Sequence, residues 1–164
     1  MKKKANLLPE EVLKMVIAVI CIIFLVFLLV SLYFSLTGEQ KKKEAEASMK
    51  SDQGGLAKEI QRINDGGTPK EQGHPVLNPS GWYILSFVGN VKKPNLCTEK
   101  NCVCICRRIY LDVLDRQIKE CDSKGSCAVV SNLNWFDKIK IENGGTWISI
   151  IKINGNIDIK KKWI

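Results

Sequence analysis

The stretch NCVCIC, residues 101–106, places three cysteines at alternate positions: Cys102, Cys104 and Cys106. Alternation is the period of a β-strand, so the pattern predicts a strand that carries all three sulfur atoms on one face. Three thiols on one face could bind a metal ion, take part in redox chemistry or form disulfides. The compartment in which this part of the chain folds decides between these outcomes.

Three further cysteines lie nearby, which makes six within 31 residues. The six are Cys97, Cys102, Cys104, Cys106, Cys121 and Cys127. An even number of cysteines in so short a segment is typical of a disulfide framework. Residues two apart on a strand have Cα atoms about 6.6 Å apart and parallel Cβ vectors, which suits a disulfide poorly. Each strand cysteine is therefore expected to pair outside the strand, which leaves six of the fifteen possible connectivities and excludes a Cys121–Cys127 bridge.

Metal binding and thiol chemistry are the two alternatives. Thiolate zinc sites use cysteine pairs with two to four residues between them. Cys97 and Cys102 fit that spacing, and Cys102 and Cys106 fit it by number alone, because cysteines along one strand converge poorly on one ion. The Cys-x-x-Cys motif of thioredoxin-like enzymes is absent from the sequence. His74, the single histidine, lies before Pro75 in a polar stretch, so we expect it to be exposed. Motifs of hydrolases, phosphate-binding loops and metalloproteases are also missing, so we expect no catalytic activity, no bound metal and no cofactor.

An apolar segment precedes the cysteine-rich region. Residues 15–36 form a run of 22 residues without a charge. As a helix this run is about 33 Å long, enough to cross the hydrocarbon core of a bilayer. We therefore expect a basic N-terminal leader at residues 1–11 and a transmembrane helix at residues 12–36, with Cys21 inside it as a small apolar residue. A cleaved signal sequence has a shorter apolar region and small residues at the cut, which SLTGEQKKK does not offer.

Residues 37–64 are charged and rich in helix-forming residues, with a break at Gly54–Gly55, so we expect a helical stalk. Leu56, Ile60 and Ile63 lie at helical spacing and form a narrow apolar stripe. We expect this stripe to pack on the domain that follows. A seam for self-association is the alternative.

Residues 65–80 contain many turn-forming residues and predict a loop linker, and residues 81–164 predict a cysteine-rich, mainly antiparallel β domain. The fold class is therefore α+β. Several segments carry strand signals: 81–88, 138–142, 146–153 and 156–164, the last two joined by the hairpin dipeptide Asn154–Gly155.

The final segment alternates, and Ile157, Ile159 and Trp163 are expected to share its inner face. The lysines at Lys160–Lys162 are typical of edge-strand protection. All four tryptophans are expected in the core or at its rim. They are Trp82, Trp135, Trp147 and Trp163.

Charge and cysteine content bear on location and partners. Residues 37–164 carry 21 of the 25 basic and 15 of the 17 acidic residues, interspersed, so we expect a solvated surface and no nucleic-acid partner. Lysines flank the apolar segment evenly and do not set its orientation. Because disulfides form in oxidising compartments, the cysteines favour residues 37–164 outside the cytoplasm and residues 1–11 inside. The expected partners are the lipid bilayer, including anionic headgroups near the flanking lysines, and other envelope proteins or copies of the chain.

In MKKKANLLPE, lysines precede a small Ala5, and a long apolar helix, a polar helical extension and a cysteine-bearing β region follow. In this order of parts the N-terminal region resembles that of type IV pilin-like proteins. The resemblance implies cleavage after Ala5, which makes Asn6 the first mature residue. Glu10 then stands fifth, where pilins often carry a glutamate that neutralises the N-terminal amine of a neighbouring subunit. Pro9 and Glu10 also suit the first turn of any helix, without such processing.

The whole layout is also similar to small, N-terminally anchored, cysteine-containing hypothetical proteins of archaeal type, a likeness that implies the architecture and no activity. The sequence as a whole predicts a single-pass membrane protein of the cell envelope. Its extracytoplasmic domain is expected to serve in binding or envelope structure without catalysis. A pilin-like filament subunit and a thiol- or metal-dependent membrane enzyme are the alternatives.

Overall fold

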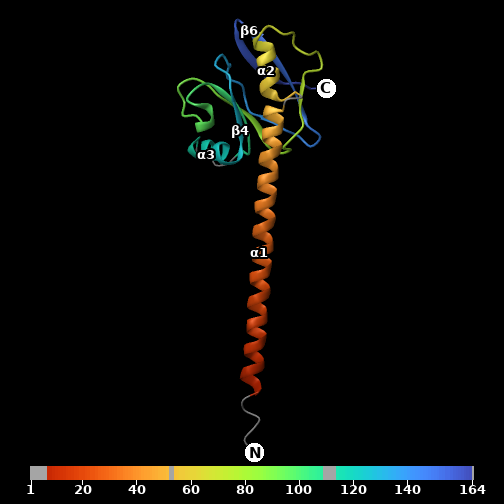
Figure 1. Cartoon of the computed structure of the whole chain (residues 1–164), viewed down its shortest axis with the longest axis vertical. Coiled ribbons are helices and arrows are strands. Elements are labelled where there is room, and N and C mark those ends of the chain that lie inside the picture. Colours follow the sequence, from red (N-terminus) through yellow and green to blue (C-terminus); the bar gives the residue numbers. More distant parts are fainter. Residues whose placement is uncertain (1–6, 52–53, 109–113, 164) are drawn as a thin grey trace, which may run out of the picture. The chain divides into compact units, whose positions relative to one another are not determined.

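The structure is a computed structural model that describes residues 7–51, 54–108 and 114–163 (Figure 1). The chain divides into two compact units, Met1–Gly38 and Glu39–Ile164. Helix α1 (Leu7–Lys50) contributes to both units. In the described part of the first unit the chain forms only the beginning of α1, whereas the second unit contains both β-sheets.

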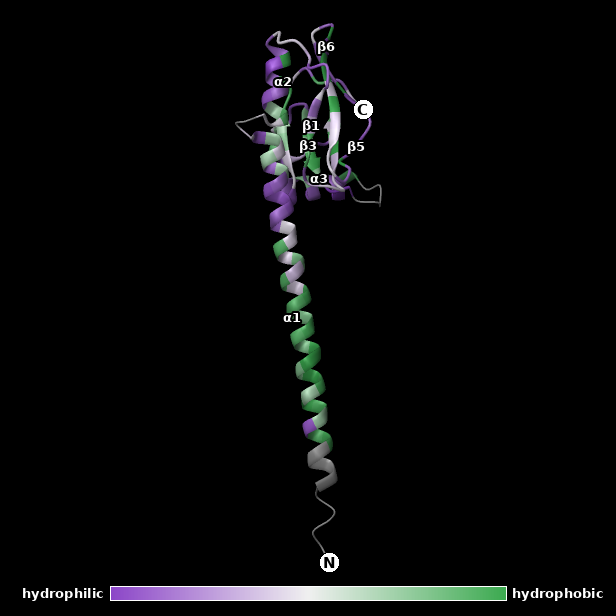
Figure 2. Ribbon diagram, turned by 90° about the vertical axis from the view of Figure 1, so that its right-hand side faces the viewer, coloured by the Kyte–Doolittle hydropathy of each residue, from purple (hydrophilic) through white to green (hydrophobic). Residues whose placement is uncertain are grey.

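The part of α1 in the first unit exposes its apolar side chains. Every residue from Val12 to Leu36 is exposed, and Lys14 is the one charged residue among them. Figure 2 shows this stretch as an almost unbroken hydrophobic ribbon. By length and composition the helix is able to cross a membrane, and a signal sequence near the N-terminus would meet the same criteria. Cys21 lies here as an exposed free thiol.

The polar part of α1 belongs to the second unit and contributes to its core. Ala45 and Met49 lie one helical turn apart and are fully buried. Lys42 Nζ donates a hydrogen bond of 3.1 Å to the backbone carbonyl of Ser123, which lies near the C-terminal end of helix α3 (Leu114–Lys124). Residues 39–50 are therefore packed into the domain, whereas the sequence led us to expect a stalk.

Helix α2 (Leu56–Asn64) follows the glycine break and packs on the same core. Its stripe of Leu56, Ile60 and Ile63 is buried, with at most 3% of each residue exposed. The expectation that this stripe packs on the domain is confirmed.

Two antiparallel sheets make up most of the second unit. One has the order β1-β6-β7, with strands β1 (His74–Val76), β6 (Thr146–Ile153) and β7 (Asn156–Lys161). The other has the order β4-β3-β2-β5, with strands β2 (Tyr83–Phe87), β3 (Cys102–Cys106), β4 (Ser126–Val129) and β5 (Ile139–Lys140). The short 3₁₀ turn η1 (Asn95–Cys97) precedes β3, and α3 (Leu114–Lys124) precedes β4. A long apolar N-terminal helix and a small antiparallel β domain, as predicted, are thus both present.

The β6–β7 hairpin forms at the predicted dipeptide. Asn154 and Gly155 both have positive φ, 49° and 84°, as the tight turns that match strand twist require. Strand alternation then buries Ile148 and Ile150 of β6 together with Ile157 and Ile159 of β7. One face of this sheet therefore covers the main core.

Strand β3 lies between two cores. Val103 and Ile105 point into the main core, with Leu56, Ile84 and the isoleucines of the β6–β7 hairpin. The cysteines at the other three positions point the opposite way, into a smaller core that includes Phe87 and Ile118. Because both faces are covered, all five residues of β3 are buried.

Several details differ from the sequence-based expectation. The segment expected to be a loop linker contains β1, so His74 is buried, with 5% of the residue exposed. Trp163 does not share the inner face with Ile157, because β7 ends at Lys161 and this tryptophan is 82% exposed. Trp135 is also 70% exposed, whereas Trp82 lies in the core as expected.

Candidate functional site

The six cysteines of the second unit form three disulfides, all packed against β3. The bonds are Cys97–Cys102, Cys104–Cys127 and Cys106–Cys121. Each cysteine of β3 has a partner from outside the strand, and Cys121 and Cys127 are not joined to each other. This pairing is one of the six that the alternation of NCVCIC allows.

The disulfide partners of the three β3 cysteines lie on three different elements. Cys97 ends the η1 turn, and the chain returns to β3 through Thr98 and Glu99, both with positive φ. Cys127 lies on β4 directly opposite Cys104 in the strand register. Cys121 lies on the inner face of α3, beside Ile118.

Two of the disulfides touch each other. Cys104 Sγ lies 3.8 Å from Cys97 Sγ and 3.9 Å from Cys102 Sγ. The sulfur atoms of Cys97, Cys104 and Cys127 all lie within 4.8 Å of one another. Thiolate sulfurs at this spacing could surround a metal ion, but the disulfide form holds no thiolates to bind one.

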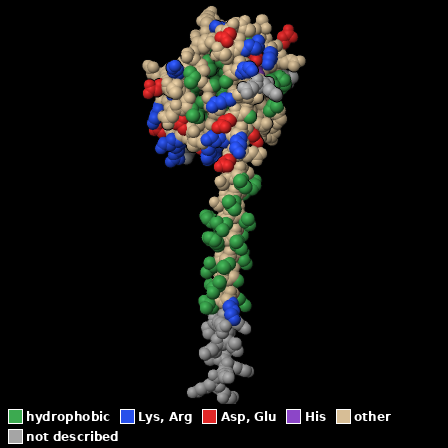
Figure 3. All heavy atoms as spheres, viewed as in Figure 1, with side chains coloured by type: hydrophobic (Ala, Val, Ile, Leu, Met, Phe, Trp, Pro, Cys, Tyr) green, Lys and Arg blue, Asp and Glu red, His purple; other side chains and the backbone are tan. Residues whose placement is uncertain are grey.

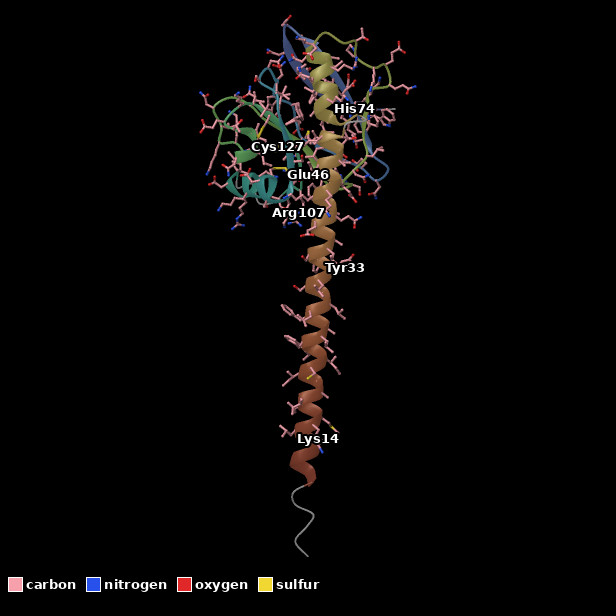
Figure 4. The ribbon with its side chains drawn as sticks, viewed as in Figure 1. Lys14, Tyr33, Glu46, His74, Arg107 and Cys127 are labelled. Atoms are coloured by element: carbon pink, nitrogen blue, oxygen red, sulfur yellow. A yellow bond between two sulfur atoms is a disulfide. The ribbon has the colours of Figure 1, made fainter. Side chains whose placement is uncertain are left out.

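The third disulfide has a polar neighbour. Gln117 Nε2, on α3, lies 3.6 Å from Cys106 Sγ and 3.5 Å from Cys121 Sγ, and it donates a hydrogen bond of 2.9 Å to the Arg107 carbonyl. These contacts fix α3 against the end of β3. Figure 4 shows Cys127 and Arg107 on this side of the unit, with the sulfur–sulfur bonds drawn in yellow.

A second group of reactive side chains lies around α2 and β1. Glu59 is 7% exposed and pairs with two bases: its Oε1 lies 2.7 Å from Arg62 Nη2, and its Oε2 lies 3.3 Å from Lys70 Nζ. The hydrogen bond from Arg62, followed by the contact with Lys70, holds the pKa of the Glu59 carboxyl below its usual value despite partial burial.

His74, labelled in Figure 4, is buried and lies close enough to Glu59 and Lys70 to feel their charges. Burial lowers the pKa of its imidazole, and the charges of Glu59 and Lys70 act in opposite directions on it. Its Nδ1 atom has no hydrogen-bond partner among the described residues. Burial therefore favours the neutral form of His74.

The sequence alone missed this group, although one signal was present. Glu59 lies three residues after Leu56 and four before Ile63, so it falls on the same helical face as the apolar stripe. A charged residue on a buried face requires a partner of opposite charge. Arg62 and Lys70 supply it.

The residues predicted for pilin-like processing lie at or before the first described residues of the chain. Ala5 and Asn6 are outside the described residues, and Glu10 lies in α1 without a described side chain. The cleavage after Ala5 therefore remains a prediction.

Two hollows on the described surface of the second unit are open to solvent. One, of about 810 Å³, is formed by the loop of residues 89–99, and another, of about 520 Å³, is lined by Trp147 and Trp163. Figure 3 shows basic and acidic side chains mixed over the surface of this unit. Neither hollow gathers a nucleophile, a base and a histidine from the described chain.

No protein-family model, curated protein or solved structure matches this chain.

Proposed function

We propose that this chain is a single-pass membrane-anchored protein of the cell envelope, with a non-catalytic domain for binding or envelope structure outside the cytoplasm. The observation that carries the proposal is the combination of an exposed apolar helix, Val12–Leu36, with a domain in which all six cysteines are paired. The exposed apolar helix requires the hydrocarbon core of a membrane. The disulfides of the domain require an oxidising compartment next to that membrane.

The orientation follows from the cysteines. Reducing cytoplasm keeps thiols reduced, whereas three disulfides in a domain of this size persist outside it. Residues 39–164 then lie outside the cytoplasm, and the lysines of the N-terminal leader lie inside. The partners in this proposal are the lipid bilayer and envelope proteins or further copies of the chain.

The non-catalytic part of the proposal rests on the histidine and the cysteines of the described chain. His74 is buried, and the charges that act on it are those of Glu59 and Lys70. The sulfur atoms next to β3 are bonded to one another and offer no thiolate.

The deciding experiment is intact-mass spectrometry of the protein purified from its native membrane, with thiol alkylation before and after reduction. We expect one alkyl group before reduction, on Cys21, and seven after it. Protease treatment of whole cells should remove the β domain and leave the N-terminal segment protected. Six domain cysteines that react without reduction, or a domain that resists protease until cells are lysed, would place the domain in the cytoplasm and refute the proposal.

A pilin-like filament subunit is the second candidate, and one feature of the structure favours it. A single helix, α1, continues from the exposed apolar stretch into the core of the domain, where Ala45 and Met49 are buried. A subunit built in this way could pack its apolar helix against those of other subunits and display its domain outside. The same mass spectrum tests this candidate, because cleavage after Ala5 removes five residues. A mature chain that begins at Met1 or Lys2 would count heavily against it.

A further inference from the structure

The hollow of about 520 Å³ in the second unit is lined by side chains that suit a sugar. We propose that this hollow, between Trp147 and Trp163, binds a neutral hexopyranose unit of an oligosaccharide. Its other lining residues are Glu71, Gln72 and Lys162. The inference rests on the binding role in the proposed function, for which it names a class of ligand. It does not depend on how the chain is anchored.

The end of the β6–β7 sheet brings the two tryptophans together. Trp147 lies on β6 and is half-buried, whereas its neighbours Thr146 and Ile148 are buried, so its side chain lies on the outer face of the sheet. The Lys162 N–H donates a hydrogen bond of 2.8 Å to the Trp147 carbonyl. The chain beyond β7 therefore stays beside β6, and Trp163 lines the same hollow as Trp147.

The ring of Trp163 is restrained although the residue is 82% exposed. Lys161 Nζ lies 4.2 Å from the centroid of this ring, in a cation–π contact. The same ammonium group lies 3.5 Å from Glu142 Oε1. A side chain that is already restrained loses less conformational entropy when a ligand binds. Trp163 is thus an accessible aromatic surface that a ligand can contact at a reduced entropic cost.

The turn before β1 adds polar groups to the rim of the hollow. Glu71 and Gln72 lie in this turn, directly before Gly73. Gly73 has a φ of 83°, and a Cβ added to it would lie 2.6 Å from the Ile148 carbonyl oxygen and 3.3 Å from Lys162 Cδ. Only glycine therefore allows the turn to approach β6 and Lys162 so closely. This close approach brings the polar side chains of the turn to the two tryptophans.

This combination of aromatic surface and polar atoms matches a pyranose ring. A hexopyranose carries C–H groups on its ring faces and hydroxyl groups at its edge, so it can pack against an indole and still form hydrogen bonds. The Glu71 carboxylate accepts hydrogen bonds, the Lys162 ammonium donates them, and the Gln72 amide does both. Because the charges of Glu71 and Lys162 are opposite, the hollow carries no net charge, which favours a neutral ligand.

Glu71 also distinguishes a sugar from a proline-rich peptide, which is the other common ligand of aromatic grooves. An extended proline-rich segment presents carbonyl oxygens, and its prolines have no N–H group to donate. A carboxylate at the rim would then have no donor to accept from. The hydroxyl groups of a sugar supply several donors. A proline peptide is therefore the competing ligand in the test.

Saturation-transfer NMR of the full-length protein in detergent micelles tests the proposal. The probes are tetrasaccharides of glucose, mannose and N-acetylglucosamine, with octaproline as the competing ligand and micelles without protein as the blank. We expect saturation to pass from the protein to the ring C–H protons of at least one sugar, with a Kd in the low millimolar range, because the hollow is open and contacts few sugar atoms. No transfer to any sugar at about 20 mM, or transfer to octaproline alone, would overturn the proposal.

Two exposed tryptophans provide a matched pair of variants. Trp163→Ala should weaken sugar binding about tenfold, because it removes an aromatic surface of the hollow. Trp135→Ala removes a tryptophan that is 70% exposed and lines a different hollow, so it should leave the affinity unchanged. Glu71→Ala should weaken binding about threefold through the loss of hydrogen bonds. Equal losses in the two tryptophan variants would overturn the proposal, and their urea midpoints show whether both remain folded.

The sugar experiment and the topology experiment have independent outcomes. If alkylation and protease treatment place the domain outside the cytoplasm and no sugar binds, the sugar site is refuted and the proposed location stands. If a sugar binds through Trp163 and the domain lies in the cytoplasm, the site stands and the proposed location is refuted.

Discussion

At the scale of single residues, the second unit buries groups that are more often exposed. Glu59 is tolerated because Arg62 and Lys70 neutralise its charge. His74 has no such compensation at Nδ1, and its burial favours the neutral imidazole. The two residues therefore respond to acid at different pH values, which makes their contributions to stability separable.

His74 is expected to make the domain less stable in mild acid. Its pKa in the folded chain is lower than the value of about 6.5 expected after unfolding, so the unfolded chain binds the proton more readily. Stability is then complete above about pH 6.5 and is lost as the pH falls through the folded-state pKa, by at most about 1.4 kcal/mol per pH unit.

Urea unfolding of the full-length protein, followed by tryptophan fluorescence at a series of pH values, measures this loss. In His74→Phe the dependence on pH in this range should disappear. The chain has a single histidine, so no other imidazole contributes. If the urea midpoint of the wild-type protein is the same at about pH 7.5 and pH 5.5, burial does not lower the pKa of the His74 imidazole.

Glu59→Gln should destabilise the domain by about 1 kcal/mol at neutral pH. The substitution removes the charge that Arg62 and Lys70 face, and these partly exposed bases regain only some of the lost interaction from water. Because the pKa of Glu59 is lowered on folding, this contribution is present above about pH 4.5 and is lost as the pH falls below it. Glu142→Gln is the matched control, since Glu142 also pairs with two lysines but lies at the surface, and it should leave the urea midpoint unchanged. Equal losses for the two variants would show that burial of the pair is unimportant.

At the scale of elements, β3 organises the domain because its two faces serve two cores. Val103 and Ile105 join the main hydrophobic core, and the cysteines opposite them join the disulfide core. The disulfides hold η1, β4 and α3 to this strand. The disulfides reduce the conformational entropy of the unfolded chain and so stabilise the folded domain, whose hydrophobic core is small.

The sequence could predict the strand and exclude most pairings, but it could not choose among the remaining six. The choice between Cys121 and Cys127 depends on the β3–β4 register, which places Cys127 opposite Cys104. It also depends on α3, whose apolar signal is only Leu114, Ile118 and Cys121 in eleven residues. Such a weak stripe is hard to distinguish from a polar loop without the surrounding fold.

Strand alternation makes a direct prediction on β6. Ile150→Ala should destabilise the domain by about 2–4 kcal/mol, because it opens a cavity in the main core, where this side chain is 4% exposed. Ile153→Ala, on the same strand and with 43% exposure, should cost less than about 1 kcal/mol. Urea midpoints of the two variants provide the measurement. Similar losses would mean that the strand register is wrong.

At the scale of the whole molecule, α1 combines two environments in one helix. Its apolar residues from Val12 to Leu36 are exposed in the first unit, and its polar continuation buries Ala45 and Met49 in the second. A cleavable signal needs only the apolar part, and a detached stalk needs no buried side chain. Because Met49 is fully buried, we expect the polar part of α1 to contribute to the stability of the second unit.

Met49→Ala tests this dependence. The truncation removes a fully buried side chain, and we expect the free energy of unfolding of the β domain to fall by about 2–5 kcal/mol. Leu32→Ala on the same helix is the matched control. Leu32 is 59% exposed in the first unit, so its loss should leave the domain unchanged in detergent. Fluorescence of the buried Trp82 during urea unfolding reports on the domain alone, because the first unit contains no tryptophan. If Met49→Ala behaves like Leu32→Ala, residues 39–50 are a stalk after all, and the domain folds without them.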